Sequence, residues 1–126
     1  MILAINTANE ITELYLLDGK DIVKEKKWNA NRQLAHDLLS EIEKLIDGKW
    51  DELSGLVVCS GPGSFTGLRI GITISNTLAY NKKIPIVGVT GKEWIKDGLK
   101  CLINDEDDRV VIPNYGAEAN ITKSKK

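Results

Sequence analysis

Apolar and polar residues form short strand-like runs at the start of the chain. Residues rich in apolar and branched side chains cover Ile2–Thr7 and Ile11–Leu17, and Asn9-Glu10 between them predicts a tight turn. Asp18-Gly19-Lys20 is a strong hairpin signal, so Asp21–Trp28 is predicted to pair antiparallel with the second strand. The charges of this third strand are typical of a sheet edge, because they discourage further pairing.

The hydrophobic period then changes to that of a helix. From Arg32 onward, apolar residues recur three and four positions apart, charged residues take the opposite side, and Gly48 stands just past the end. This pattern predicts an amphipathic helix that packs on the sheet. The apolar face consists of Leu34, Ala35, Leu38, Leu39, Ile42, Leu45 and Ile46.

The second half of the chain repeats a strand–helix order. Leu56–Cys59 is apolar without alternation, which indicates a strand covered on both faces and therefore a parallel sheet with helical crossovers. A helix is predicted from about Thr66 to Tyr80, a buried strand over Ile84–Val89, and a third helix after Thr90. The sequence thus predicts an α/β fold with a mixed five-stranded sheet and helices against it.

The end of the chain shows weaker patterns. Asp105–Asp108 lacks the spacing of a calcium loop and predicts a solvated turn, and Arg109–Ile112 predicts a last short strand. One domain over residues 1–112 is expected, followed by an irregular tail over 113–126 that ends in the basic run Lys123-Ser124-Lys125-Lys126.

The predicted second helix is too apolar for a helix that packs on one side only. Arg69 is the only charged residue between Gly67 and Tyr80, so we expect burial on more than one side. Small residues recur every four positions, which would let another helix approach closely. That helix could be the first helix of this chain or could belong to another chain, and both readings stay open. The small residues are Gly67, Gly71, Ser75 and Ala79.

Composition and charge narrow the class of protein. The chain has 126 residues and a net charge of -1, which gives no overall electrostatic signal for nucleic-acid binding. Two isolated cysteines, Cys59 and Cys101, favour free thiols in a reducing, cytoplasmic setting. No apolar run approaches the ~18 residues of a membrane span, so no membrane partner is expected.

The glycine-rich turn at Ser60–Gly71 carries the candidate chemistry. Such a turn can bind an anion through free N–H groups and the helix dipole, or it can let a helix lie close to its neighbour. Neither the Walker A pattern nor the dinucleotide fingerprint is met, so a capping role for Ser64 or Thr66 is favoured and phosphate or nucleotide binding is the alternative. An anion would contact Gly61, Gly63, Ser64, Thr66 and Gly67.

Two segments resemble the TsaB (YeaZ) family. They are Ala4-Ile5-Asn6-Thr7-Ala8 and the run from Gly61 to Gly71, and Ile86-Val87-Gly88-Val89-Thr90 also fits. The resemblance covers roughly residues 1–90. It implies an RNase H-like, actin-like ATPase lobe and a non-catalytic role in bacterial synthesis of threonylcarbamoyladenosine on tRNA, with no catalytic residue, no metal and no required cofactor.

The chain departs from the family pattern in two ways. Family members are longer and have a second lobe, so a shortened, single-lobe form is expected. Asn6 stands where relatives usually carry Asp, which argues against phosphoryl chemistry and leaves weak ATP binding as the alternative. The catalytic sister subunit would carry a metal-binding His-x-x-x-His, and His36 is the only histidine here.

The resemblance also implies the partners and the surface that meets them. A catalytic TsaD-like subunit, or a second copy of this chain, is expected to dock on the first two helices as a helical bundle. A TsaE-like ATPase is a further expected partner, the chain alone is expected to form a homodimer, and direct contact with tRNA stays open. The implied interface residues are Leu38, Leu39, Ile42, Arg69, Ile70, Thr73, Ile74 and Thr77.

Overall fold

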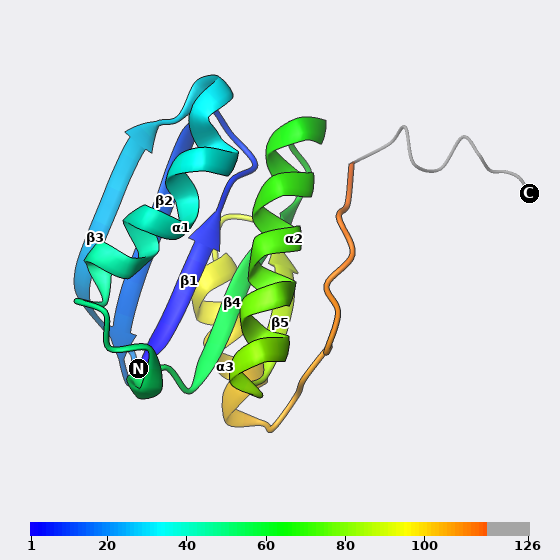
Figure 1. The fold of residues 1–126 in the computed structure, drawn as a ribbon. Helices are drawn as coiled ribbons and strands as arrows, with labels where there is room; N and C mark the ends of the chain where they lie inside the picture. Colours follow the sequence, from blue (N-terminus) through cyan, green and yellow to red (C-terminus); the bar gives the residue numbers. More distant parts are fainter. Residues whose placement is uncertain (116–126) are drawn as a thin grey trace, which may run out of the picture.

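A computed structural model describes residues 1–115 and shows a mixed sheet covered by helices on both faces (Figure 1). The strands are β1 (Ile2–Asn6), β2 (Ile11–Asp18), β3 (Asp21–Asn29), β4 (Gly55–Gly61) and β5 (Ile86–Thr90). The helices are α1 (Leu34–Leu45), α2 (Phe65–Lys82) and α3 (Trp94–Ile103), with short 3-10 turns at Asn31–Gln33 and Trp50–Glu52.

The sheet has five strands in the order β3-β2-β1-β4-β5. β1 pairs antiparallel with β2 and parallel with β4, so Ile5 lies opposite both Leu14 and Val58. The β2–β3 pair is antiparallel and the β4–β5 pair is parallel. This arrangement confirms the predicted α/β fold class, and β3 is an edge strand as its charges predicted.

The core is built on β4, whose seven residues are all buried. α1 and α2 cover one face of the sheet and α3 covers the other (Figure 1). On the α3 side, a Cβ on Gly98 would lie 2.2 Å from Cγ1 of Val57, so the glycine lets this helix lie directly on the strand. The apolar run in β4 is therefore covered from both sides, as its lack of alternation predicted.

The N-terminal half of α2 lies against the end of β1. A Cβ on Gly67 would lie 2.4 Å from the carbonyl oxygen of Thr7, and one on Gly71 would lie 2.1 Å from the Thr7 hydroxyl oxygen. That hydroxyl donates a hydrogen bond of 2.8 Å to the Gly67 carbonyl. The prediction that these glycines admit another helix is therefore wrong, because their close neighbour is a strand end.

α2 begins at a capped turn. The Ser64 hydroxyl accepts a hydrogen bond of 3.3 Å from the Gly67 N–H and is the N-cap, whereas Thr66 lies inside the first turn and is exposed. The structure thus selects one of the two predicted caps.

The last described segment, Asp107–Tyr115, is an extended strap that follows the outer flank of α2 and β5 (Figure 1). The predicted strand at Arg109–Ile112 is wrong, because this segment forms no sheet ladder, and the backbone of Val111 pairs with the Asn76 side chain instead. The acidic turn is exposed, as predicted, but it also has a structural role. Carboxylates of Asp107 and Asp108 accept hydrogen bonds of 3.1 and 2.8 Å from the N–H groups of Ile86 and Gly88 on β5.

The predicted tail is only partly within the described residues. The Asn114 N–H donates a hydrogen bond of 2.7 Å to the Ser60 carbonyl, so the first residues of the tail lie on the folded body. Residues 116–126, with the basic run Lys123-Ser124-Lys125-Lys126, lie outside the described residues.

The contact at Gly71 predicts whether an alanine there raises or lowers the free energy of unfolding. Alanine usually stabilises a helix by about 1 kcal/mol relative to glycine. At Gly71, however, the new methyl group would collide with the buried Thr7 side chain, so we expect Gly71→Ala to lower the free energy of unfolding by about 1–3 kcal/mol. Urea unfolding measures this, with the exposed Thr73→Ala in the same helix as the control. A Gly71→Ala protein that is more stable than the wild type would contradict the close packing.

The cap gives a second test. Ser64→Ala removes the acceptor of the Gly67 N–H and is expected to lower the free energy of unfolding by about 1 kcal/mol. Thr66→Ala, two positions on, is expected to change it by less than about 0.5 kcal/mol. Equal effects of the two substitutions in urea unfolding would show that Ser64 is not the cap.

Candidate functional site

A groove of ≈ 320 Å³ lies between α1 and α2. It brings together four residues that the family resemblance implied for the interface, and two that it did not imply. Ala35 was predicted to lie on the core side of α1 but is exposed, and Thr66 was considered only as a cap or anion contact. The lining residues are Ala35, Thr66, Arg69, Ile70, Thr73 and Ile74.

Two further predicted residues extend this surface. Leu39 is one helical turn beyond Ala35 and is 47% exposed, so it adds an apolar side chain to the surface beside the groove. Thr77 is exposed one turn beyond Thr73 and donates a hydrogen bond of 2.9 Å to the Thr73 carbonyl. We call the combined surface the docking face. It consists of Ala35, Leu39, Thr66, Arg69, Ile70, Thr73, Ile74 and Thr77.

Two predicted interface residues do not belong to the docking face. Leu38 and Ile42 are each 0% exposed in the core beneath α1. They cannot contact a partner without unfolding of the helix from the sheet, so the prediction is wrong for these two residues. The apolar face of α1 is wider than the part of it that is buried against the sheet. Its exposed edge consists of Ala35 and Leu39.

Arg69 supplies the only formal charge of the docking face. Its guanidinium carbon lies 5.3 Å from the centre of the Phe65 ring. Within residues 1–115, no carboxylate forms an ion pair with it. The groove thus combines apolar and methyl groups with one cation at its rim, a composition that can bury apolar side chains and pair with an acidic group.

The turn before α2 is packed against the end of β1. The Ser64 N–H donates a hydrogen bond of 2.8 Å to the Ala8 carbonyl, and a Cβ on Gly63 would lie 2.4 Å from the same oxygen. Gly61 has a φ of 123°, which side chains other than glycine rarely adopt. These glycines therefore serve the tight turn and the close approach of its backbone to Ala8.

An anion at this turn would compete with existing hydrogen bonds and would lie near a carboxylate. The N–H groups of Ser64 and Gly67 already have partners, in the Ala8 carbonyl and the Ser64 hydroxyl. Glu10 also lines the hollow beside Thr66 and Gly67, and its negative charge disfavours a phosphate there. The geometry favours the capping and packing role over anion binding.

Two other features bear on catalysis. Cys59 and Cys101 are free thiols, and burial raises the pKa of both thiols, which disfavours the reactive thiolate. In the described part of the chain, no three His, Cys, Asp or Glu side chains gather closely enough to hold a metal ion. None of the helices between residues 1 and 115 combines the length and apolar character needed to cross a membrane.

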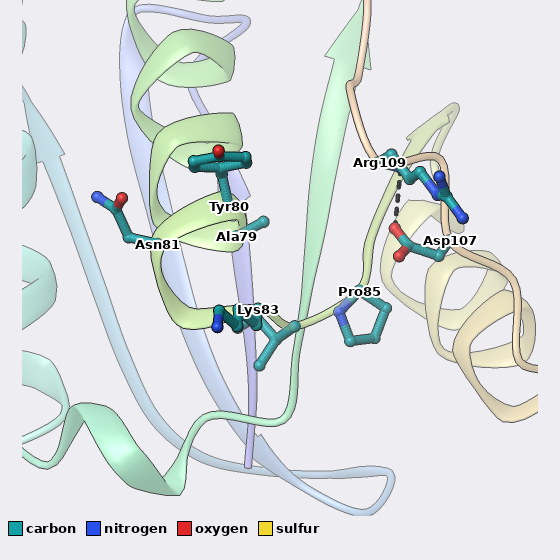
Figure 2. A pocket seen from close by; sticks show the side chains of 8 residues that line it. Ala79, Tyr80, Asn81, Lys83, Pro85, Asp107 and Arg109 are labelled. Atoms are coloured by element: carbon teal, nitrogen blue, oxygen red, sulfur yellow. Dashed lines mark hydrogen bonds between the residues drawn. The ribbon is translucent and has the colours of Figure 1, made fainter.

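A hollow of ≈ 620 Å³ lies at the C-terminal end of α2 (Figure 2). Tyr80 stands on its α2 side, and Asp107 and Arg109 stand on the strap side. The Arg109 N–H donates a hydrogen bond of 2.8 Å to the Asp107 carboxylate, the contact drawn in Figure 2. Charges of both signs line this hollow, so its electrostatics favour neither an anion nor a cation.

Comparison with known proteins identifies the relatives of the chain. The family model described as TsaD, tRNA N6-adenosine threonylcarbamoyltransferase, matches residues 25–97, more than half of the chain. The tRNA threonylcarbamoyladenosine biosynthesis protein TsaB of Bacillus subtilis is 38% identical over 101 residues, covering 75% of this chain and 42% of the relative. TsaB of Escherichia coli is 30% identical over 117 residues, covering 86% of this chain and 51% of the relative.

The structural comparison agrees with these matches. YeaZ from Pseudomonas aeruginosa superposes with a TM-score of 0.65 at 27% identity, covering 71% of this chain and 43% of YeaZ. The transferase of Listeria monocytogenes matches a shorter stretch, 36% identical over 52 residues, or 41% of this chain and 15% of the enzyme. The chain spans about half the length of the curated TsaB relatives, at 42% and 51% of them. On the family model, the TsaB relatives and the YeaZ fold together, the chain belongs to the TsaB (YeaZ) family.

Proposed function

We propose that this chain is a non-catalytic scaffold subunit in the biosynthesis of tRNA threonylcarbamoyladenosine. In this proposal it docks a TsaD-like catalytic subunit, or a second copy of itself, through the docking face. The observation that carries the proposal is the open groove between α1 and α2, which leaves Leu39 47% exposed beside apolar lining residues. The TsaB relatives, which are named for this biosynthesis, support the pathway.

The chemistry of the groove suits a helical partner. Ile70 and Ile74 are half-buried one turn apart on α2, and Ala35 and Leu39 are exposed one turn apart on α1. Spacing of this kind fits a third helix that lays apolar side chains between the two, in the manner of a helix-in-groove contact. An acidic residue at the edge of that helix would pair with Arg69.

The proposed lack of catalysis is supported by the end of β1. Asn6 is 6% exposed, and its side-chain oxygen accepts a hydrogen bond of 2.9 Å from the Ala8 N–H. The amide thus caps its own turn. A neutral amide is also a weaker ligand for Mg²⁺ than the carboxylate that ATP-using relatives usually carry there. In the proposed assembly a TsaE-like ATPase would bring the nucleotide chemistry.

The docking face is tested by copurification with a TsaD-like subunit. Ile74→Asp and Leu39→Asp each put a charge where apolar side chains would be desolvated, so each is expected to weaken binding at least about tenfold, or about 1.4 kcal/mol. Ile103→Asp is the matched control, because Ile103 is 80% exposed on α3, on the other face of the sheet.

The binding results can be interpreted only if each variant is folded, which circular dichroism and urea unfolding verify. Wild-type affinity of both docking-face variants, for the catalytic subunit and for a second copy, would refute the docking face. Equal weakening by Ile103→Asp would show that the effect is not local to α1 and α2.

Nucleotide binding gives a separate prediction. Because the Ser64 and Gly67 N–H groups have partners and Glu10 lines the hollow, we expect no measurable heat when the chain is titrated with millimolar Mg-ATP. Isothermal titration calorimetry measures this. Saturable heat that Ser64→Ala abolishes would favour a phosphate-binding domain instead.

A further inference from the structure

A side chain of α2 binds the backbone of the strap. The Val111 N–H donates a hydrogen bond of 2.9 Å to the Asn76 side-chain oxygen, and the Asn76 side-chain nitrogen donates one of 3.0 Å to the Val111 carbonyl. A single amide therefore pairs with both polar groups of one strap residue. The Asn76 amide thus satisfies the backbone polar groups of an extended segment that has no strand partner there.

A glycine makes room for the strap's buried side chain. Val111 is 4% exposed, and a Cβ on Gly88 would lie 2.6 Å from its Cγ1. Any larger residue on β5 at this position would push Val111 out. Val110 and Ile112 on either side are 64% and 77% exposed, so only alternate strap residues face the protein.

The far end of the strap has its own contacts. The Asn114 N–H donates a hydrogen bond of 2.7 Å to the Ser60 carbonyl, and a Cβ on Gly61 would lie 2.0 Å from the Asn114 carbonyl oxygen. The ring of Tyr115 stacks on Phe65, with 4.7 Å between ring centres. The strap is thus anchored at both a β-branched and an aromatic residue, four positions apart.

We infer that the surface formed by Ser60, Gly61, Phe65, Asn76 and Gly88, which we call the strap site, is a peptide-binding site. Its ligand class is an extended segment with a β-branched aliphatic residue, followed four positions later by an aromatic one. In this chain the strap occupies the site in cis. A segment of a partner protein with the same chemistry binds there when the strap leaves.

The strap of the same chain competes with such a partner and so lowers the apparent affinity of the strap site for it. A covalently linked segment competes at an effective concentration of about a millimolar or more, so a free peptide binds the wild type only weakly. Displacing Val111 removes this competition and leaves the site open. The strap site lies along β5 on the flank of α2 away from α1 (Figure 1), and it meets the docking face at Phe65, whose ring centre lies 5.3 Å from the Arg69 guanidinium carbon.

The test uses the full chain and a fluorescent peptide of residues 106–115. Val111→Asp places a charge in the buried position and releases the strap, so we expect it to bind the peptide at least about tenfold more tightly than the wild type does. Adding Asn76→Ala to this variant is expected to return binding to the wild-type level. A control peptide that itself carries Val111→Asp is expected not to bind.

A folded Val111→Asp protein that binds the peptide no better than the wild type, or that binds both peptides equally, overturns the proposal. A second measurement covers the case in which this variant fails to fold. In the wild type, amide hydrogen exchange at Val111 is expected to be slow and to rise at least about tenfold in Asn76→Ala, with β4 amides unchanged. Equal exchange at Val111 in both proteins overturns it as well. Because Val111 is outside the docking face, copurification with a TsaD-like subunit tests the proposed function separately.

Discussion

The contact between the end of β1 and the start of α2 is the constraint on which the rest of the structure depends. Two glycines of α2 leave no room for a side chain against Thr7, and the turn before them is hydrogen-bonded to Ala8. α2 must therefore lie close along β1 and β4. Its position in turn fixes the groove that it shares with α1 on one flank and the strap site on the other.

This placement gives each side of an unusually apolar helix its own neighbour. The row of small residues faces the sheet, Ile70 and Ile74 face the groove beside α1, and Asn76 faces the strap. The glycine-rich turn before this helix has the composition of an anion-binding turn, although it meets neither the Walker A pattern nor the dinucleotide fingerprint. Here the N–H groups of Ser64 and Gly67 are engaged in packing and capping, which agrees with the proposed scaffold role.

Much of the fold follows from local sequence patterns. The hairpin signal at Asp18-Gly19-Lys20, the helical period of α1 and the unalternated run of β4 predicted the sheet and its helices, because each pattern is complete within a few residues. The site was only partly predictable. Hydrophobic periodicity defines an apolar stripe but not its outer limit, so Leu38 could not be distinguished from Leu39. The strap was missed because Asn76 and Val111, which hold it, are 35 positions apart and show no local pattern.

Hydrogen–deuterium exchange of the full chain, with and without a saturating TsaD-like subunit, tests the central claim most directly. The account predicts that the complex slows exchange in α1 around Ala35–Leu39 and in α2 around Thr66–Thr77. It predicts no change in α3, which lies on the other face of the sheet, or in β3, which contributes no residue to the docking face. Protection confined to β3 or α3, with α1 and α2 unchanged, would contradict the account.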